Sequence, residues 1–298
     1  MKRKPYDPLK PRITTLLWML GPAVVMLAVY LIWPIFQTLK LSLYDWNGID
    51  RKAKAIGFGN WVELFHDHIF WLSVKNSFIL LLISALVEIP IGLGLAILIF
   101  RGGKRFRIFK FGYFFPFMMS TVGISILFKQ IFDTNFGLIN QVLGILHLSG
   151  LEQDWLGNKH LAIYTVALLI CWQYIPFYML LFLAALNGIS PDIEEAAAID
   201  GAASWKFTRY IQIPLIRGAM ITALLLIVIG SLKYFDLIWV LTNGGPEFST
   251  SVMASYLYTL AFKNYRVGYA STVAGALFFI VFITAISIGR ITKRFREV

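Results

Sequence analysis

Cysteine and charge are both scarce in this 298-residue chain. The single cysteine, Cys171, excludes a disulfide framework and a zinc cluster built from cysteines. Charged residues make up 14% of the chain, against about 25% in average soluble domains, whereas hydrophobic residues make up 58%. The composition therefore favours a membrane protein with several spans of about 20 apolar residues each.

Sequence patterns for nucleotide, metal and carrier chemistry are also missing. The chain has no Gly-x-x-x-x-Gly-Lys-[Ser/Thr] phosphate loop, which excludes a P-loop ATPase. It also lacks the three-fold Pro-x-[Asp/Glu] signature of mitochondrial carriers. The four histidines fall in predicted outer loops, and His66 and His68 would diverge on a helix, so we assign no metal site. Because the apolar stretches contain no nucleophile–base pair, we assign no catalytic residue and no cofactor, and we expect no enzymatic activity.

Six apolar stretches are long enough to cross a bilayer as helices. We predict spans at about 14–36, 71–100, 108–132, 161–187, 219–242 and 269–289, within one transmembrane domain over 1–298. The predicted fold is all-α, a polytopic membrane protein with six transmembrane helices. The basic N-terminal tail resembles the start of a signal peptide. The apolar run after it is long enough to span and has no small-residue cleavage site, so we expect an uncleaved first helix.

The distribution of Lys and Arg predicts the orientation of the chain. The two tails, the second loop and the fourth loop carry 17 of the 27 Lys and Arg residues, whereas the opposite face carries seven. Because basic residues are enriched on the cytoplasmic side, both termini and the fourth loop are predicted to be cytoplasmic. The net charge of +11 then reflects topology and anionic lipid headgroups, so we expect no nucleic-acid partner.

The fourth loop, about 190–214, is polar and rich in alanine although it lies between two apolar spans. Ser190 is a predicted N-cap, acidic residues follow in the first turn, and Gly201 predicts a left-handed stop. The alanines allow a close approach to another protein, and Glu195 offers a charge to an arginine or lysine. We favour a docking helix; the alternative is an amphipathic helix resting on lipid headgroups. The candidate docking residues are Glu194, Glu195, Ala196, Ala197, Asp200 and Gly201.

Polar and aromatic side chains within the fourth and fifth spans are candidates for a substrate path, because lipid-facing positions reject polar groups. Aromatic rings stack on the apolar face of a sugar, while amides, hydroxyls and carboxylates bind its hydroxyls. Lys233 and Asp236 are three residues apart, so they could pair on one helix face. Ordinary interhelical packing is the structural alternative for each residue. The candidates are Gln173, Tyr174, Phe177, Ser231, Lys233, Tyr234 and Asp236.

Two of the charged residues within the other predicted spans, Glu88 and Lys129, are further candidates. Glu88 is deep in the second span, and Lys129 is near the outer end of the third. Each could mark an ion route, but a buried pair or a snorkelling Lys129 is the favoured interpretation. Lys129 and Lys233 together also leave an anionic substrate open.

The fourth loop and the segment after the fifth span carry patterns of a known family. Glu195-Ala196-Ala197, followed by Gly201 and by Ile211-x-Ile213-Pro214, resembles the EAA loop of membrane subunits of bacterial ABC importers. That loop usually ends in Leu-Pro, where this chain has Ile213-Pro214. The run Leu241-Thr242-Asn243-Gly244-Gly245-Pro246 resembles a segment of the carbohydrate branch, in its first permease subunit of maltose or glycerol-3-phosphate type. The resemblance extends over nearly the whole chain.

The resemblance implies a type I importer transmembrane domain with a cytoplasmic coupling helix in the inner membrane. It implies a heterodimer with a second permease, two ATP-binding subunits that hydrolyse ATP, and an extracytoplasmic substrate-binding protein. In related maltose-type subunits the sugar contacts map close to Tyr174, Phe177, Ser231 and Tyr234, although asparagines of those subunits are replaced here. The implied cargo is a sugar or oligosaccharide. The alternatives are a non-sugar or anionic substrate, such as glycerol 3-phosphate or a uronate, and a stand-alone secondary carrier.

Overall fold

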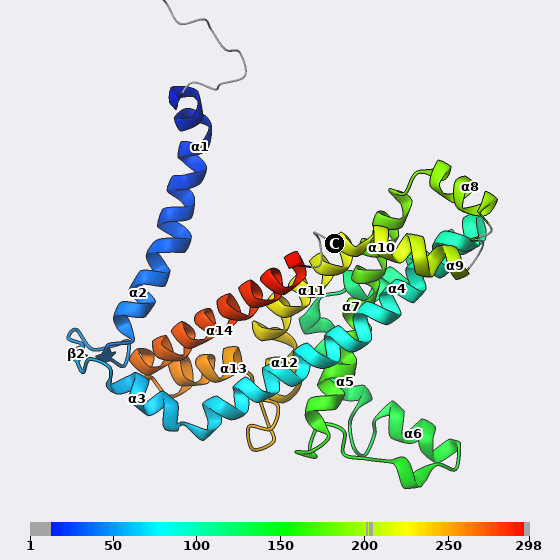
Figure 1. The fold of residues 1–298 in the computed structure, drawn as a ribbon. Helices are drawn as coiled ribbons and strands as arrows, with labels where there is room; N and C mark the ends of the chain where they lie inside the picture. Colours follow the sequence, from blue (N-terminus) through cyan, green and yellow to red (C-terminus); the bar gives the residue numbers. More distant parts are fainter. Residues whose placement is uncertain (1–12, 201, 203–204, 295–298) are drawn as a thin grey trace, which may run out of the picture. The chain divides into compact units, whose positions relative to one another are not determined.

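The computed structural model describes residues 13–200, 202 and 205–294, and this part of the chain is almost entirely helical (Figure 1). Two short strands, β1 (Tyr44–Asp45) and β2 (Lys54–Ala55), pair antiparallel with Tyr44 opposite Ala55. The all-α prediction is confirmed. The α-helices are α1 (Ile13–Leu27), α2 (Trp33–Leu41), α3 (Gly59–His66), α4 (His68–Met118), α5 (Thr121–Ile131), α6 (Leu138–Ile145), α7 (Ala162–Asn187), α8 (Pro191–Ile199), α9 (Trp205–Phe207), α10 (Ile213–Leu215), α11 (Arg217–Leu232), α12 (Asp236–Thr242), α13 (Met253–Tyr258) and α14 (Val267–Arg294).

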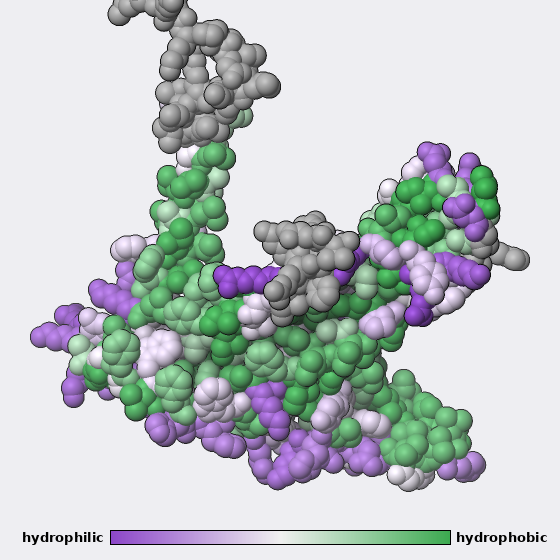
Figure 2. Space-filling view, in the orientation of Figure 1, coloured by the Kyte–Doolittle hydropathy of each residue, from purple (hydrophilic) through white to green (hydrophobic). Residues whose placement is uncertain are grey.

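Several of these helices are long and apolar enough to cross a membrane. By length and composition four qualify, and the number rises to six if each of two bent pairs forms one span. The pairs are bent by 104° and 63°. Figure 2 shows apolar side chains over much of the visible surface, which is the surface expected of helices solvated by lipid. The four helices are Trp18–Leu41, His68–Gly102, Ala162–Asn187 and Val267–Arg290, and the pairs are Gly112–Met118 with Thr121–Ile131 and Trp205–Leu215 with Arg217–Leu232.

The helix boundaries differ from the predicted spans at 101–107, at 233–235 and at 119–120, where the predicted third span is divided between α4 and α5. The basic stretch 101–107, predicted as a loop, is helical, and α4 continues through it for 51 residues. Lys and Arg lower the hydropathy of a segment, but they are good helix formers, so they end an apolar run without ending a helix. The predicted fifth span is divided between α11 and α12, with residues 233–235 between them.

The described residues form two compact units, and the first contains residues 13–65 and 260–275. Its buried polar groups are hydrogen bonded to one another. The Asn60 amide donates to the carbonyl oxygens of Ser42 at 2.9 Å and Tyr44 at 3.0 Å. The Trp61 indole donates to the Ser42 hydroxyl at 3.1 Å, and the Thr272 hydroxyl donates to the Ser42 carbonyl at 3.3 Å. These bonds join the end of α2, the hairpin, α3 and the first turns of α14.

The second unit contains the described residues of 66–259 and 276–294, and α4 packs along α7 within it. Gly92 allows the close approach, since a Cβ there would lie 3.1 Å from the Tyr178 Cβ and 3.2 Å from the Met179 nitrogen. Two apolar clusters stabilise the unit. One is built around Ile170, Leu237 and Leu241, and the other around Tyr178, Phe182 and Ile227.

Candidate functional site

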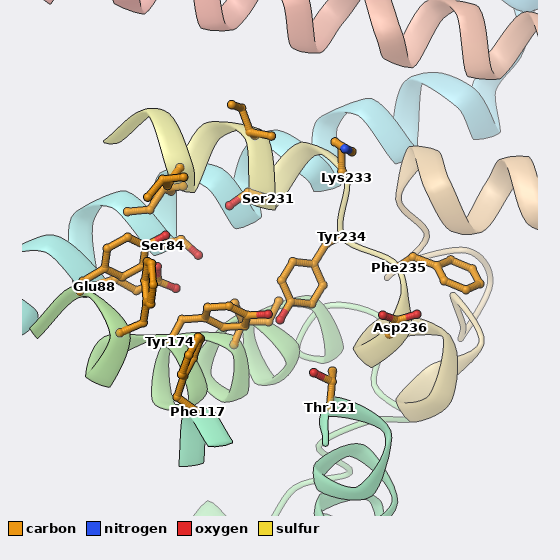
Figure 3. A pocket seen from close by; sticks show the side chains of 17 residues that line it. Ser84, Glu88, Phe117, Thr121, Tyr174, Ser231, Lys233, Tyr234, Phe235 and Asp236 are labelled. Atoms are coloured by element: carbon orange, nitrogen blue, oxygen red, sulfur yellow. The ribbon is translucent and has the colours of Figure 1, made fainter. Parts of the chain in front are cut away.

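A cavity of about 440 Å³ lies in the second unit, where these two apolar clusters meet. Its volume is within the range of roughly 300–1,000 Å³ typical of small-molecule sites. Side chains of α4, α5, α7, α11 and α12 surround it (Figure 3). The lining residues are Ser84, Glu88, Phe117, Thr121, Ile170, Tyr174, Phe177, Tyr178, Leu226, Ile227, Ile229, Gly230, Ser231, Lys233, Tyr234, Phe235 and Asp236.

One wall of the cavity is the break between α11 and α12. α11 ends at Leu232, and Lys233 has φ −105° and ψ 7°. Phe235, at φ −140° and ψ −62°, precedes the first turn of α12. Non-helical backbone within a membrane span is tolerated where it faces a cavity rather than lipid, and broken helices of this kind form substrate sites in transporters. The four residues at the break, 233–236, all line the cavity.

Aromatic rings form a second wall of the cavity. The Phe117 ring stacks on Phe177, with centroids 5.1 Å apart and an interplanar angle of 29°. Tyr174 meets the edge of Phe117 at 5.8 Å and the ring of Tyr234 at 6.0 Å. Figure 3 shows the hydroxyl ends of Tyr174 and Tyr234 meeting in the middle of the cavity, between Glu88 and Asp236. The arrangement offers apolar ring surface beside hydroxyl groups.

Three buried oxygen atoms at or beside the cavity have no hydrogen-bond partner among the described residues. They are Glu88 Oε1, Gln173 Oε1 and the Tyr234 hydroxyl oxygen. The Glu88 and Gln173 side chains are each 2% exposed. Buried polar atoms in proteins almost always have partners, because an unpaired one costs roughly 1–3 kcal/mol. Three such atoms in one place therefore mark the cavity as a site for a polar ligand.

The structure brings six of the seven predicted path residues to this cavity: Tyr174, Phe177, Ser231, Lys233, Tyr234 and Asp236. Gln173 is not among the lining residues, but its amide nitrogen donates to the hydroxyl of Thr121, which is, at 3.2 Å. The predicted pairing of Lys233 with Asp236 is wrong. The two residues lie on either side of the helix break rather than on one helix face, and they form no ion pair in the described part of the chain.

Sequence reasoning missed six lining residues that carry polar or aromatic groups. Five of them, Ser84, Phe117, Thr121, Tyr178 and Phe235, gave no local signal of their own. Glu88 was visible in the sequence as a carboxyl group deep in a predicted span, but the favoured interpretation was that it pairs with another buried residue. Among the described residues Glu88 has no cationic partner, and its side chain lines the cavity instead.

The predicted docking segment begins with α8, which follows α7 after a short turn. Ser190 occupies the N-cap position, as expected, but its hydroxyl bonds the Asp192 carboxylate at 3.1 Å rather than the helix backbone. Glu194, Glu195 and Ala196 are exposed, whereas Ala197 is buried. Asp200 is the C-cap and is exposed. The predicted stop at Gly201 lies outside the described residues.

Beyond α8 the chain continues through α9, a π-helical turn (Thr208–Gln212) and α10. Ile199, Trp205 and Tyr210 expose large apolar side chains here. Two fully buried groups anchor the π-helical turn, since the Thr208 hydroxyl donates to Gln212 Oε1 at 2.7 Å and accepts from the Arg101 guanidinium of α4. The hydrogen bond from Arg101 thus links the partly exposed apolar and acidic surface of the α8–α10 segment to α4, the helix that carries Glu88.

Comparisons with known proteins agree with this architecture. The sequence profile of binding-protein-dependent transport system inner membrane components matches residues 88–296. The chain is 32% identical over 258 residues to the lactose transport system permease protein LacF of Rhizobium radiobacter, covering 85% of this chain and 86% of that one. It is 31% identical over 280 residues to the diacetylchitobiose uptake system permease protein NgcF of Streptomyces coelicolor, covering 89% and 78%.

A crystal structure of a bacterial ABC transporter involved in the import of the acidic polysaccharide alginate has the same fold. Its matching chain superposes with a TM-score of 0.81 at 22% identity, over 95% of this chain and 96% of that one. The family profile spans more than half of the sequence. This chain therefore belongs to the family of multi-pass inner membrane permeases of binding-protein-dependent ABC transport systems.

Proposed function

We propose that this chain is the permease subunit of an ATP-driven importer and that, with a second permease, it forms the path of a sugar or oligosaccharide across the inner membrane. The observation that carries the proposal is the cavity at the α11–α12 break, with ring surface on one side and unpartnered polar atoms on the other. Relatives named for lactose and diacetylchitobiose uptake support a sugar as cargo.

The lining residues suit a sugar in a specific way. Tyr174, Phe177 and Phe117 provide ring faces on which the apolar side of a pyranose stacks. Ser231, Tyr234 and Asp236 provide hydroxyl and carboxylate groups for its hydroxyls, Lys233 adds an ammonium donor, and Gln173 holds Thr121 in place. Each of these residues is proposed to bind substrate or to position a residue that does.

The α8–α10 segment is proposed to dock the ATPase in the cytosol. Glu194, Glu195 and Asp200 offer charges to basic residues of an ATP-binding subunit, and the small exposed Ala196 keeps that face of α8 narrow enough for a groove. The segment joins α11 at a 63° bend, and α11 ends at the cavity. A displacement of α8 would therefore be passed to the cavity wall along one continuous stretch of chain.

The proposed assembly contains this chain, a second permease, two ATP-binding subunits and an extracytoplasmic substrate-binding protein. The chain itself has no P-loop, so ATP hydrolysis belongs to its partners. A related alginate transporter is known in complex with a substrate-bound periplasmic protein, which supports a binding-protein partner. The excess of Lys and Arg in the tails and the fourth loop supports cytoplasmic termini.

Charge reversal at Glu195 tests this proposal. We expect Glu195→Lys to abolish ATP-dependent uptake of the sugar by the assembled importer and to release the ATP-binding subunits during purification. The control is Glu152→Lys, the same change at an exposed carboxylate far along the chain from α8. Normal uptake in Glu195→Lys, with the ATPase still attached, would contradict the docking role.

A further inference from the structure

One buried hydrogen-bond acceptor in the cavity wall lacks a donor, and a second lies beside the cavity. Glu88 Oε1 and Gln173 Oε1 both accept hydrogen bonds, and neither receives one from the described residues. Both side chains are 2% exposed, so water in the bulk does not reach them. The unpartnered Tyr234 hydroxyl can donate or accept. A ligand that satisfies this site must bring hydrogen-bond donors.

Glu88 is held so that one carboxyl oxygen remains available. The side chains of Ser84 and Cys171 lie beside its carboxyl group. The second oxygen, Oε1, has no partner among the described residues, and Glu88 and Ser84 both line the cavity. Figure 3 shows Glu88 at one end of the cavity and Asp236 at the other. Glu88 therefore presents a single acceptor to whatever occupies the space beside Tyr174.

The charges around the cavity differ in their contact with solvent. Lys233 and Asp236 are exposed, so solvent screens them, whereas the Glu88 carboxyl is buried. A sugar carboxylate placed in the cavity would present only hydrogen-bond acceptors to Glu88 Oε1, and its charge would be costly to bury in a medium of low polarity. A sugar hydroxyl in the same place would donate to Oε1 at no such cost.

We infer that the cavity selects an uncharged sugar unit, one of whose hydroxyl groups donates to Glu88, and that Glu88 discriminates against acidic sugars. The inference rests on the proposed function and adds the class of sugar and the residue that sets it. The similarity in fold to an alginate transporter is no evidence that this chain binds the same substrate, since the two chains are 22% identical.

The test uses cells that produce the complete importer, from which this chain is deleted and then restored as the wild type or as a variant. Growth and radiolabelled uptake are measured on a panel of neutral disaccharides and trisaccharides and on their uronic-acid counterparts. We expect the deletion to remove uptake of a neutral glycan. Glu88→Gln should then lower uptake of that glycan about tenfold or more at limiting concentration, because an amide NH2 group in the place of Oε1 donates and does not accept the sugar hydroxyl.

The variants distinguish a role in specificity from a structural role. Glu88→Gln keeps the size of the side chain, and we expect it to reduce the preference for the neutral over the acidic glycan at least about tenfold. Gln173→Met should also lower neutral uptake. Glu152→Gln, the same change at an exposed carboxylate, should behave as the wild type. The amount of each variant in the membrane is measured in parallel, and uptake is expressed per assembled importer.

Three outcomes would overturn the inference. If the deletion removes uptake of acidic glycans alone, the proposed function stands and the substrate class is wrong. If the cargo is neutral but Glu88→Gln transports it normally, Glu88 is not the selecting residue. If the deletion affects uptake of no glycan in the panel, the proposed function itself fails, and the inference fails with it.

Discussion

The two units of the chain differ in how completely their buried polar side chains are hydrogen bonded. In the described part of the first unit, no buried side-chain nitrogen or oxygen lacks a hydrogen-bond partner, and Asn60, Trp61 and Thr272 all converge on Ser42. In the second unit, Glu88, Gln173 and Tyr234 leave three buried oxygens without partners around one cavity. Satisfied groups stabilise a fold, whereas unsatisfied groups lower stability and provide affinity for a ligand.

Replacing one buried amide in each unit gives the largest expected contrast in stability. Asn60→Leu removes the donor to the Tyr44 carbonyl, so we expect the free energy of unfolding to fall by roughly 1–3 kcal/mol. Gln173→Met removes an acceptor that has no donor together with one bond to Thr121, so the change in stability should be near zero. Thermal unfolding of the purified chains in detergent measures both. Equal losses in the two variants would show that the two units do not differ in this way.

Two helical glycines sharpen the comparison between packed and open positions. At Gly92 a methyl group would press on Tyr178 and Met179, so we expect Gly92→Ala to cost roughly 1–3 kcal/mol of stability. At Gly230, which lines the cavity, a Cβ would meet nothing within 4 Å, so Gly230→Ala should be neutral or more stable by up to about 1 kcal/mol. The melting temperatures of the two variants provide the measurement. A destabilised Gly230→Ala beside an unaffected Gly92→Ala would reverse the assignment.

The exposed ion pair of the first unit should contribute least. Arg266 donates two hydrogen bonds to the Glu63 carboxylate, at 2.8 and 2.7 Å, but both side chains are nearly half exposed. Solvent screens such pairs, so we expect Glu63→Gln to cost about 0.2–1 kcal/mol. The loss should shrink further as salt is raised, which unfolding curves at two ionic strengths would detect. A loss as large as that of Asn60→Leu would mean that the pair is more shielded than its exposure indicates.

Much of the fold and part of the site follow from the sequence because they depend on local chemistry. Long apolar runs form helices in a bilayer, since the backbone has no other partner there. Polar side chains inside such runs avoid lipid, which is why Tyr174, Ser231 and Tyr234 could be predicted to share one space. The composition of residues 190–200 likewise determined a short polar helix after α7.

The tertiary structure decided which side of each helix faces which neighbour and where a helix breaks. Glu88 is a buried acid in any reading of the sequence, but its rotation toward the cavity depends on how α4 packs against α7 through Gly92. The break at 233–235, which separates Lys233 from Asp236, depends on the packing of Leu237 and Leu241 into the cluster around Ile170. Helical periodicity is a local property of the chain, whereas helix rotation and helix ends are determined by contacts between residues far apart in sequence.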